Sequence, residues 1–196
     1  MIEFYDDLFG IAVSARLRAN EALRGATLTR EDTTQLQQIL KTNPHDDVRD
    51  SALYAIMRNR LYECGDMVFD LFKVDKSDRV KQTALMTLVI LRYKSCLPHL
   101  RQYIQCENTI SDNQVSYVIF ALGEFKCHDS VDQLASFVQH SRSEMLIATA
   151  LKALGKIGTT FDDKRWITSF LKQYIEHPSV LVSYSAETSL ELIRKS

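Results

Sequence analysis

Residues 46–56 read DDVRDSALYAI, and this stretch decides the fold. It places small residues at positions 52 and 55 and a large aliphatic residue, Ile56, directly after them. Residues spaced i, i+3 and i+4 share one face of an α-helix. Because small residues on that face let a neighbouring helix approach closely, the stretch predicts a helix that packs against other helices.

The same pattern recurs along the chain. Its last members are Leu23, Ile56, Leu88, Leu122, Leu154 and Leu190, at intervals of 33, 32, 34, 32 and 36 residues. A second helical pattern lies between them, and its last members are Leu40, Phe72, Ile104, Val138 and Ile175, at intervals of 32, 32, 34 and 37 residues. These two series of residues are here called ladders. Because both recur at nearly the same interval, they indicate a repeat of two helices, here named A and B. Such pairs bury their apolar faces only by stacking.

The repeats resemble the HEAT-like repeats of the PBS-lyase type. The residues that carry this resemblance are Asp47-Val48-Arg49 with Ala52 and Ala55, Val80-Lys81 with Ala84, Ala121-Leu122-Gly123 and Ala153-Leu154-Gly155. The likeness covers residues 44–195 well and residues 3–42 more loosely. It departs from the family pattern where later units lack the basic residue after Val and carry Val115, Ile147 and Ser183 instead.

We therefore expect an all-α fold, a right-handed α-solenoid of about five antiparallel helix pairs plus a C-terminal capping helix. We expect one domain over residues 1–196. Its units are predicted at 3–42, 46–74, 77–106, 112–140 and 143–176, and the capping helix at 179–194. Asp is a strong N-cap residue, so we expect Asp46, Asp78 and Asp112 to cap their A helices, with Ser143 capping the next. Thr29 and Asp32 are expected to cap the first B helix.

The period breaks in the fifth unit. The A-to-B spacing is 17, 16, 16 and 16 residues in the first four units and 21 in the fifth, which predicts about five extra residues within 158–166, GTTFDDKRW. Insertions in repeat proteins often form binding loops, so Phe161 and Trp166 are candidate anchors. In the alternative reading, Asp162 or Asp163 caps the B helix and Trp166 packs against the capping helix. The linker 105–113, about two residues longer than its counterparts, is expected to be a plain loop.

Composition narrows the classes of function. The chain carries 24 basic and 25 acidic residues. This balance disfavours non-specific electrostatic binding to nucleic acid or to an acidic membrane. The acidic start is not a secretory signal, and the longest apolar stretch is shorter than the about 20 residues that span a bilayer. We therefore expect a cytoplasmic protein that does not enter membranes.

Sequence signatures of catalysis are missing. There is no phosphate-binding Gly-rich loop, no His-Glu-x-x-His and no His-Glu pair of the kind seen in metal-binding helical-repeat hydroxylases. The tightest group of potential ligands is Cys127-His128-Asp129, which we interpret as a solvated turn rather than a zinc site. Cys64, Cys96, Cys106 and Cys127 are expected to be reduced and partly buried. No catalytic residue, metal or cofactor is expected.

The exposed positions of the B helices are rich in Gln and carry both signs of charge. Such a surface suits a protein or peptide better than a lipid or a phosphate polymer. We therefore predict a non-catalytic binding module, a scaffold or adaptor that holds a partner protein along the B helices of units two to five. It is expected to be a monomer or a weak homodimer. The predicted contact residues are Arg101, Gln102, Asp132, Gln133, Phe161, Trp166, Lys172 and Gln173.

Other readings stay open at this point. A toxin-neutralising or regulatory protein would be one version of the binding module. A nucleic-acid-binding or DNA-repair protein is the alternative from another class, because HEAT-like DNA glycosylases exist. A tetrapyrrole lyase or chaperone-like subunit is a further alternative, suggested by the lyase family that shares these repeats. The sequence also leaves open whether the first unit caps the array or extends the groove.

Overall fold

The computed structural model describes residues 2, 5–10, 13–105 and 111–196, with the side chain of residue 105 excepted. The chain divides into two compact units, residues 1–93 and 94–196, here called unit 1 and unit 2. From here on, the helix pairs predicted from the sequence are called repeats, and 'unit' refers only to these two parts of the chain. Each is described by itself. The expected long linker falls mostly outside the described residues, as does Cys106.

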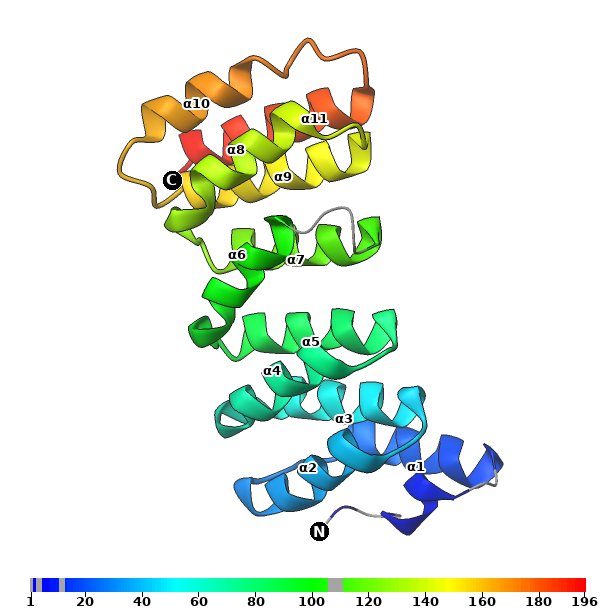
Figure 1. Cartoon of the computed structure of the whole chain (residues 1–196). Coiled ribbons are helices and arrows are strands. Elements are labelled where there is room, and N and C mark those ends of the chain that lie inside the picture. The colour runs from blue at the N-terminus through cyan, green and yellow to red at the C-terminus, as the bar shows by residue number, and fades with distance from the viewer. Residues whose placement is uncertain (1, 3–4, 11–12, 106–110) are drawn as a thin grey trace. The chain divides into compact units, whose positions relative to one another are not determined.

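In unit 1 the A helices form one layer and the B helices form the other (Figure 1). The A helix α3 packs against the A helix α1 on one side and α5 on the other, and the B helices α2 and α4 contact each other. Short 3-10 turns lead into both B helices. The elements of unit 1 are η1 (Asp6–Phe9), α1 (Val13–Gly25), η2 (Arg30–Asp32), α2 (Thr33–Thr42), α3 (Asp46–Asn59), η3 (Tyr62–Cys64), α4 (Gly65–Val74) and α5 (Asp78–Ile90).

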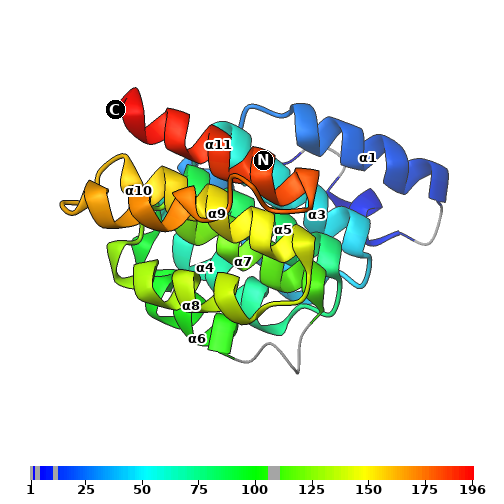
Figure 2. The same ribbon diagram turned by 90° about the horizontal axis from the view of Figure 1, so that it is seen from above.

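Unit 2 repeats this arrangement. The A helix α9 packs between α7 and α11, and Figure 2 shows α9 flanked by α8 and α11. The capping helix α11 contacts both α9 and α10. The elements of unit 2 are η4 (Lys94–Cys96), α6 (Leu97–Gln105), α7 (Asp112–Glu124), η6 (His128–Ser130), α8 (Val131–His140), α9 (Glu144–Gly158), α10 (Lys164–Lys172) and α11 (Val180–Arg194).

Most members of the two predicted ladders form the core, whereas Leu190 is only half-buried. In the A helices the final ladder residues Ile56, Leu88, Leu122 and Leu154 are fully buried. In the B helices Leu40, Phe72, Ile104 and Val138 are at most 3% exposed. Local i, i+3, i+4 periodicity therefore identified the residues through which the helices pack.

The fifth B helix corrects the predicted register. Its buried face is Ile167, Phe170 and Leu171, whereas Ile175, the predicted ladder member, is 38% exposed and lies beyond the helix. Both triplets satisfy the i, i+3, i+4 rule, so the pattern alone could not tell one helical turn from the next. Only burial against α9 and α11 selects the earlier turn.

The predicted insertion is therefore in the wrong place. The first residues of the paired helices are 19 apart for α3 and α4 and for α7 and α8, and 20 apart for α9 and α10. The connection after α10, residues 173–179, is seven residues long, against three between α4 and α5 and three between α8 and α9. The extra length lies after α10, and residues 159–163 form a turn of ordinary length.

Three A helices end in the same way. Arg60, Arg92 and Lys126 adopt left-handed backbone conformations with φ of 51°, 53° and 52°. In each case the following residue donates its N–H to the carbonyl of the ladder residue, as Cys127 does to Leu122 at 3.0 Å. These are Schellman motifs. They reverse the chain toward the B helix at a fixed distance from the ladder, which keeps successive repeats in register.

The helix starts differ from the prediction by one residue. The N-cap residues are His45, Ser77 and Ser111, and each acid predicted to cap is the first residue of its helix. Ser143 occupies the N-cap position of α9, as predicted, but its side chain forms no capping hydrogen bond. An acid at the first helical position still interacts favourably with the positive end of the helix dipole. The capping box of Thr29 and Asp32 is confirmed.

The fold class is confirmed: the chain is all-α, built from repeated helix pairs with a C-terminal capping helix. No strand occurs in the described residues. Among the helices described, none has both the length and the apolar character needed to cross a membrane. A single domain over the whole chain stays a prediction.

Candidate functional site

All eight predicted contact residues lie in unit 2, on or beside its B helices. Arg101 and Gln102 are on α6, Asp132 and Gln133 on α8, and Trp166 and Lys172 on α10, with Gln173 following and Phe161 in the turn before it. Gln102, Asp132, Lys172 and Gln173 are exposed. None of these four side chains forms a hydrogen bond or ion pair with another described residue.

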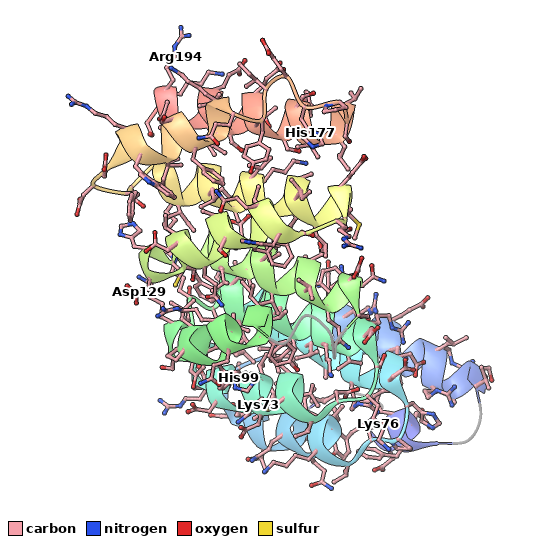
Figure 3. The ribbon with its side chains drawn as sticks, turned by 45° about the horizontal axis from the view of Figure 1, so that its top comes forward. Lys73, Lys76, His99, Asp129, His177 and Arg194 are labelled. Carbon is pink, nitrogen blue, oxygen red and sulfur yellow. The ribbon has the colours of Figure 1, made fainter. Side chains whose placement is uncertain are left out.

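Arg101 and Gln133 are instead used within the protein. The Gln133 side-chain amide donates to the Arg101 carbonyl at 2.7 Å and so joins α8 to α6. The Arg101 guanidinium lies 3.4 Å from the carboxylate of Asp129 in the turn before α8, a residue labelled in Figure 3. Both predicted contacts therefore help to hold neighbouring repeats of unit 2 together.

Phe161 is half-buried and packs against His128. Its ring meets the edge of the His128 ring at 5.3 Å and 90°. His128 Nε2 also lies 3.1 Å from the hydroxyl oxygen of Thr160. The turn before α10 thus contacts the turn before α8 through His128.

Trp166 lies at the surface and belongs to a row of rings along α10. It is 40% exposed and stacks on Phe170, with centroids 5.6 Å apart and planes at 9°. Phe170 contacts Tyr174, whose ring stacks with that of His177. Asp163 caps α10 by accepting the Trp166 N–H at 3.2 Å, as one alternative predicted. The indole therefore packs on Phe170 and is otherwise partly exposed to solvent.

A second surface was not predicted from sequence. In unit 1, the faces of α2 and α4 that point toward each other enclose an open groove of about 770 Å³. Thr33, Gln37, Leu40 and Lys41 form one wall. The other wall and the ends are formed by Arg49, Glu63, Asp66, Met67, Asp70, Leu71, Lys73, Val74, Asp75 and Lys76. Since α2 belongs to the first repeat, this repeat contributes one wall of the groove.

The groove has apolar walls and charged ends. Met67 and Leu71 line it together with Val74, which is 74% exposed. Glu63 and Asp66 stand at the N-terminal end of α4, and Lys76 stands beyond its C-terminal end. Figure 3 labels Lys73 and Lys76. Met67, which is half-buried, and Val74, which is exposed, lie at helical spacing on a B helix and were the sequence signal for this surface.

The thiols of Cys64, Cys96 and Cys127 are buried and form no disulfide with a described residue. Burial raises the pKa of the Cys64 thiol to about 11 and that of Cys96 to about 12. The Cys127 thiol is also buried, and its sulfur accepts a hydrogen bond from the Ser130 hydroxyl at 3.1 Å. Within the described ranges, no group of three or more His, Cys, Asp or Glu side chains is placed to hold a metal ion.

Comparison with known proteins identifies the fold. A designed armadillo repeat protein superimposes with a TM-score of 0.60 at 16% sequence identity, covering 97% of this chain and 98% of its own. The fold is that of an armadillo-like helical repeat protein. Human deoxyhypusine hydroxylase is also similar, at 15% identity over 98% of this chain and 95% of its own, with a TM-score of only 0.42. No protein-family model and no curated protein matches the sequence.

Proposed function

We propose that this protein is a non-catalytic binding module, a scaffold or adaptor that holds a partner protein or peptide against its B helices. The observation that carries the proposal is the groove between α2 and α4, whose apolar walls and charged ends are open to a partner. A concave site that combines apolar side chains with charged groups at defined positions is typical of binding sites.

The B-helix surface of unit 2 supports the same proposal. Gln102, Asp132, Lys172 and Gln173 present two amides, one acid and one base to solvent. Opposite signs of charge on one surface favour a protein partner of complementary pattern. A phosphate polymer would instead be bound by basic residues in excess, so nucleic acid is the alternative that the experiment must exclude.

An affinity capture from a lysate of the source organism tests the proposal. The bait is the wild-type protein, and the retained material is identified by mass spectrometry and by staining for nucleic acid. A charge-reversed variant, Asp132→Lys with Lys172→Glu, changes the B-helix surface without touching Arg101 or Gln133. The matched control, Glu21→Lys with Lys152→Glu, reverses one acid and one base at exposed positions of A helices.

One protein that is retained by the wild type and the control but lost by the B-helix variant would support the proposal. Nucleic acid retained in a salt-dependent way would support the repair-type alternative instead. A partner retained equally by all three baits would show that the B helices of unit 2 do not bind it. Circular dichroism of each variant must first show unchanged helix content.

A further inference from the structure

We infer that the groove between α2 and α4 binds a short extended peptide segment with a basic residue at one end, apolar residues in the middle and an acidic residue at the other end. The inference rests on the proposed function and specifies the chemistry of the partner. Three observations carry it: the apolar side chains of the groove, the position of the charges that have no counter-charge among the described residues, and the length of the groove.

Apolar side chains line the groove between Glu63 and Lys76, and they are only partly covered. Leu40 and Leu71 are buried at its base, at 2% and 7% exposure. Val74 is 74% exposed, and Met67 is half-buried. Covering apolar surface of this kind favours association. The middle of the groove therefore favours aliphatic side chains of a partner.

Charges along the groove are neutralised in pairs at two places. Lys73 lies 2.7 Å from Asp70 on the same helix. Arg49 lies 2.7 Å from Asp75. These four side chains have little net charge to offer a partner. Both pairs lie on or next to α4, and the charged lining residues outside them are Lys41, Glu63, Asp66 and Lys76.

The uncompensated charges have opposite signs. Glu63 is exposed just before α4, while Lys41 is exposed in the last turn of α2 and Lys76 just after α4. None of the three forms an ion pair with any residue that the structure describes. Asp66 adds a second acid near Glu63 and accepts a hydrogen bond from Tyr93. The acidic end thus attracts a basic partner residue, and the basic end attracts an acidic one.

The length of the groove sets the spacing. α4 has ten residues and is therefore about 15 Å long at 1.5 Å per residue. An extended chain advances about 3.3 Å per residue, so about four or five residues of the partner span the groove. An extended segment can run in either direction, because only the positions of its charges are fixed by the groove.

The same charges also interact with the dipoles of α2 and α4. Acids near helix N-termini and bases near C-termini stabilise helices. This effect changes stability and requires no partner. A test of the inference must therefore measure binding separately from thermal stability.

Fluorescence anisotropy with three labelled nonapeptides makes that separation. The matched peptide GGRLSLDGG has its opposite charges four residues apart, and GGRDLSLGG has the same composition with adjacent charges. The third peptide, GGRLSLRGG, carries two bases. The variant Lys41→Glu with Lys76→Glu makes both ends of the groove acidic. A control with Lys126→Glu and Lys152→Glu has the same net charge but is altered only in unit 2.

We expect the wild type and the control to bind the matched peptide at least tenfold more tightly than the other two peptides. The groove variant should bind the two-base peptide more tightly than the matched one, and added salt should weaken both preferences. A wild type that does not distinguish the first two peptides would overturn the inference, even if the groove variant failed to fold. A folded variant with unchanged preference would overturn it as well. If a B-helix-dependent partner is captured from lysate but the peptides are not distinguished, the inference fails and the proposed function stands.

Discussion

Arg49 and Asp75 form a buried ion pair that joins the first turn of α3 to the loop after α4. Arg49 Nε lies 2.7 Å from one carboxylate oxygen, and Nη2 lies 3.1 Å from the other. Arg49 also donates to the carbonyl of Asn43 at 2.8 Å, and Asp75 accepts the N–H of Ser77 at 2.8 Å. One pair thus fixes the loops that follow both B helices of unit 1.

Replacing Arg49 with Ala should lower the free energy of unfolding by about 3–5 kcal/mol, because it leaves a buried carboxylate without its cation. The Asp75 side chain is 3% exposed. Lys195→Ala is the control, since Lys195 and Glu191 are 76% and 69% exposed, and it should cost less than about 1 kcal/mol. Urea denaturation measures both. Equal small losses would show that the buried pair adds nothing to stability.

Gly123→Ala should destabilise the protein by about 1–3 kcal/mol through overpacking. A Cβ at Gly123 would lie 2.7 Å from the Cα of Ala153, so α7 and α9 would have to separate. At Gly25 an added Cβ meets no atom within 4 Å, so Gly25→Ala should be neutral or stabilising by up to about 1 kcal/mol. Thermal unfolding followed by circular dichroism compares the two. A neutral Gly123→Ala would mean that this helix contact is loose.

Lys126→Gly should raise the free energy of unfolding by about 0.5–1 kcal/mol. Lys126 has a φ of 52°, a conformation that costs non-glycine residues energy and that glycine adopts freely. Lys152→Gly, in the middle of α9, should instead cost about 1 kcal/mol. Chemical denaturation measures the change in the free energy of unfolding for both variants. Opposite signs would show that the effect at Lys126 comes from its left-handed conformation and not from a general effect of glycine. A loss at both positions would contradict the expectation.

Trp166 and Phe170 should separate binding from stability. Phe170 is 6% exposed, and Phe170→Ala should cost about 3–5 kcal/mol of stability. Trp166 is 40% exposed, so Trp166→Ala should cost only about 0.5–1.5 kcal/mol, the value of its stacking contact. If Trp166 is the predicted anchor, its removal should weaken the captured complex by about 2 kcal/mol or more. Calorimetry should compare the affinity of the captured partner for the wild type and for a folded Trp166→Ala protein. An unchanged affinity would mean that Trp166 has only a structural role.

Stability should fall at alkaline pH partly because of Cys64. Burial raises the pKa of its thiol from 9.0 to about 11. The unfolded chain therefore ionises first, and the stabilising contribution is complete below pH 9 and is lost as the pH rises from about 9 to about 11. Urea titrations at pH 8 and 10.5 should show a larger loss for the wild type than for Cys64→Ala. Equal losses would mean that the thiol does not contribute.

Much of the fold could be predicted from the sequence, because periodicity and turn chemistry are local properties. The A helix predicted from residues 46–56 is α3, and the capping helix predicted at 179–194 is α11 (Val180–Arg194). The register of the fifth B helix could not be predicted, since Leu171 satisfies both competing triplets. Among the candidate site residues, Gln102, Asp132, Lys172 and Gln173 are exposed as expected. Arg101 and Gln133 are used to join α6 to α8.

By itself, the sequence determined that this protein is a stack of paired helices, because the i, i+3, i+4 spacing within each helix dictates which side chains must be buried. Only the tertiary structure decided where the surface is hollow and which charges stay free. The groove depends on how far α2 and α4 stand apart, and the free charge of Lys41 and Lys76 depends on where acids from other repeats come to lie. Those distances arise from packing between residues of different repeats, which no local pattern encodes.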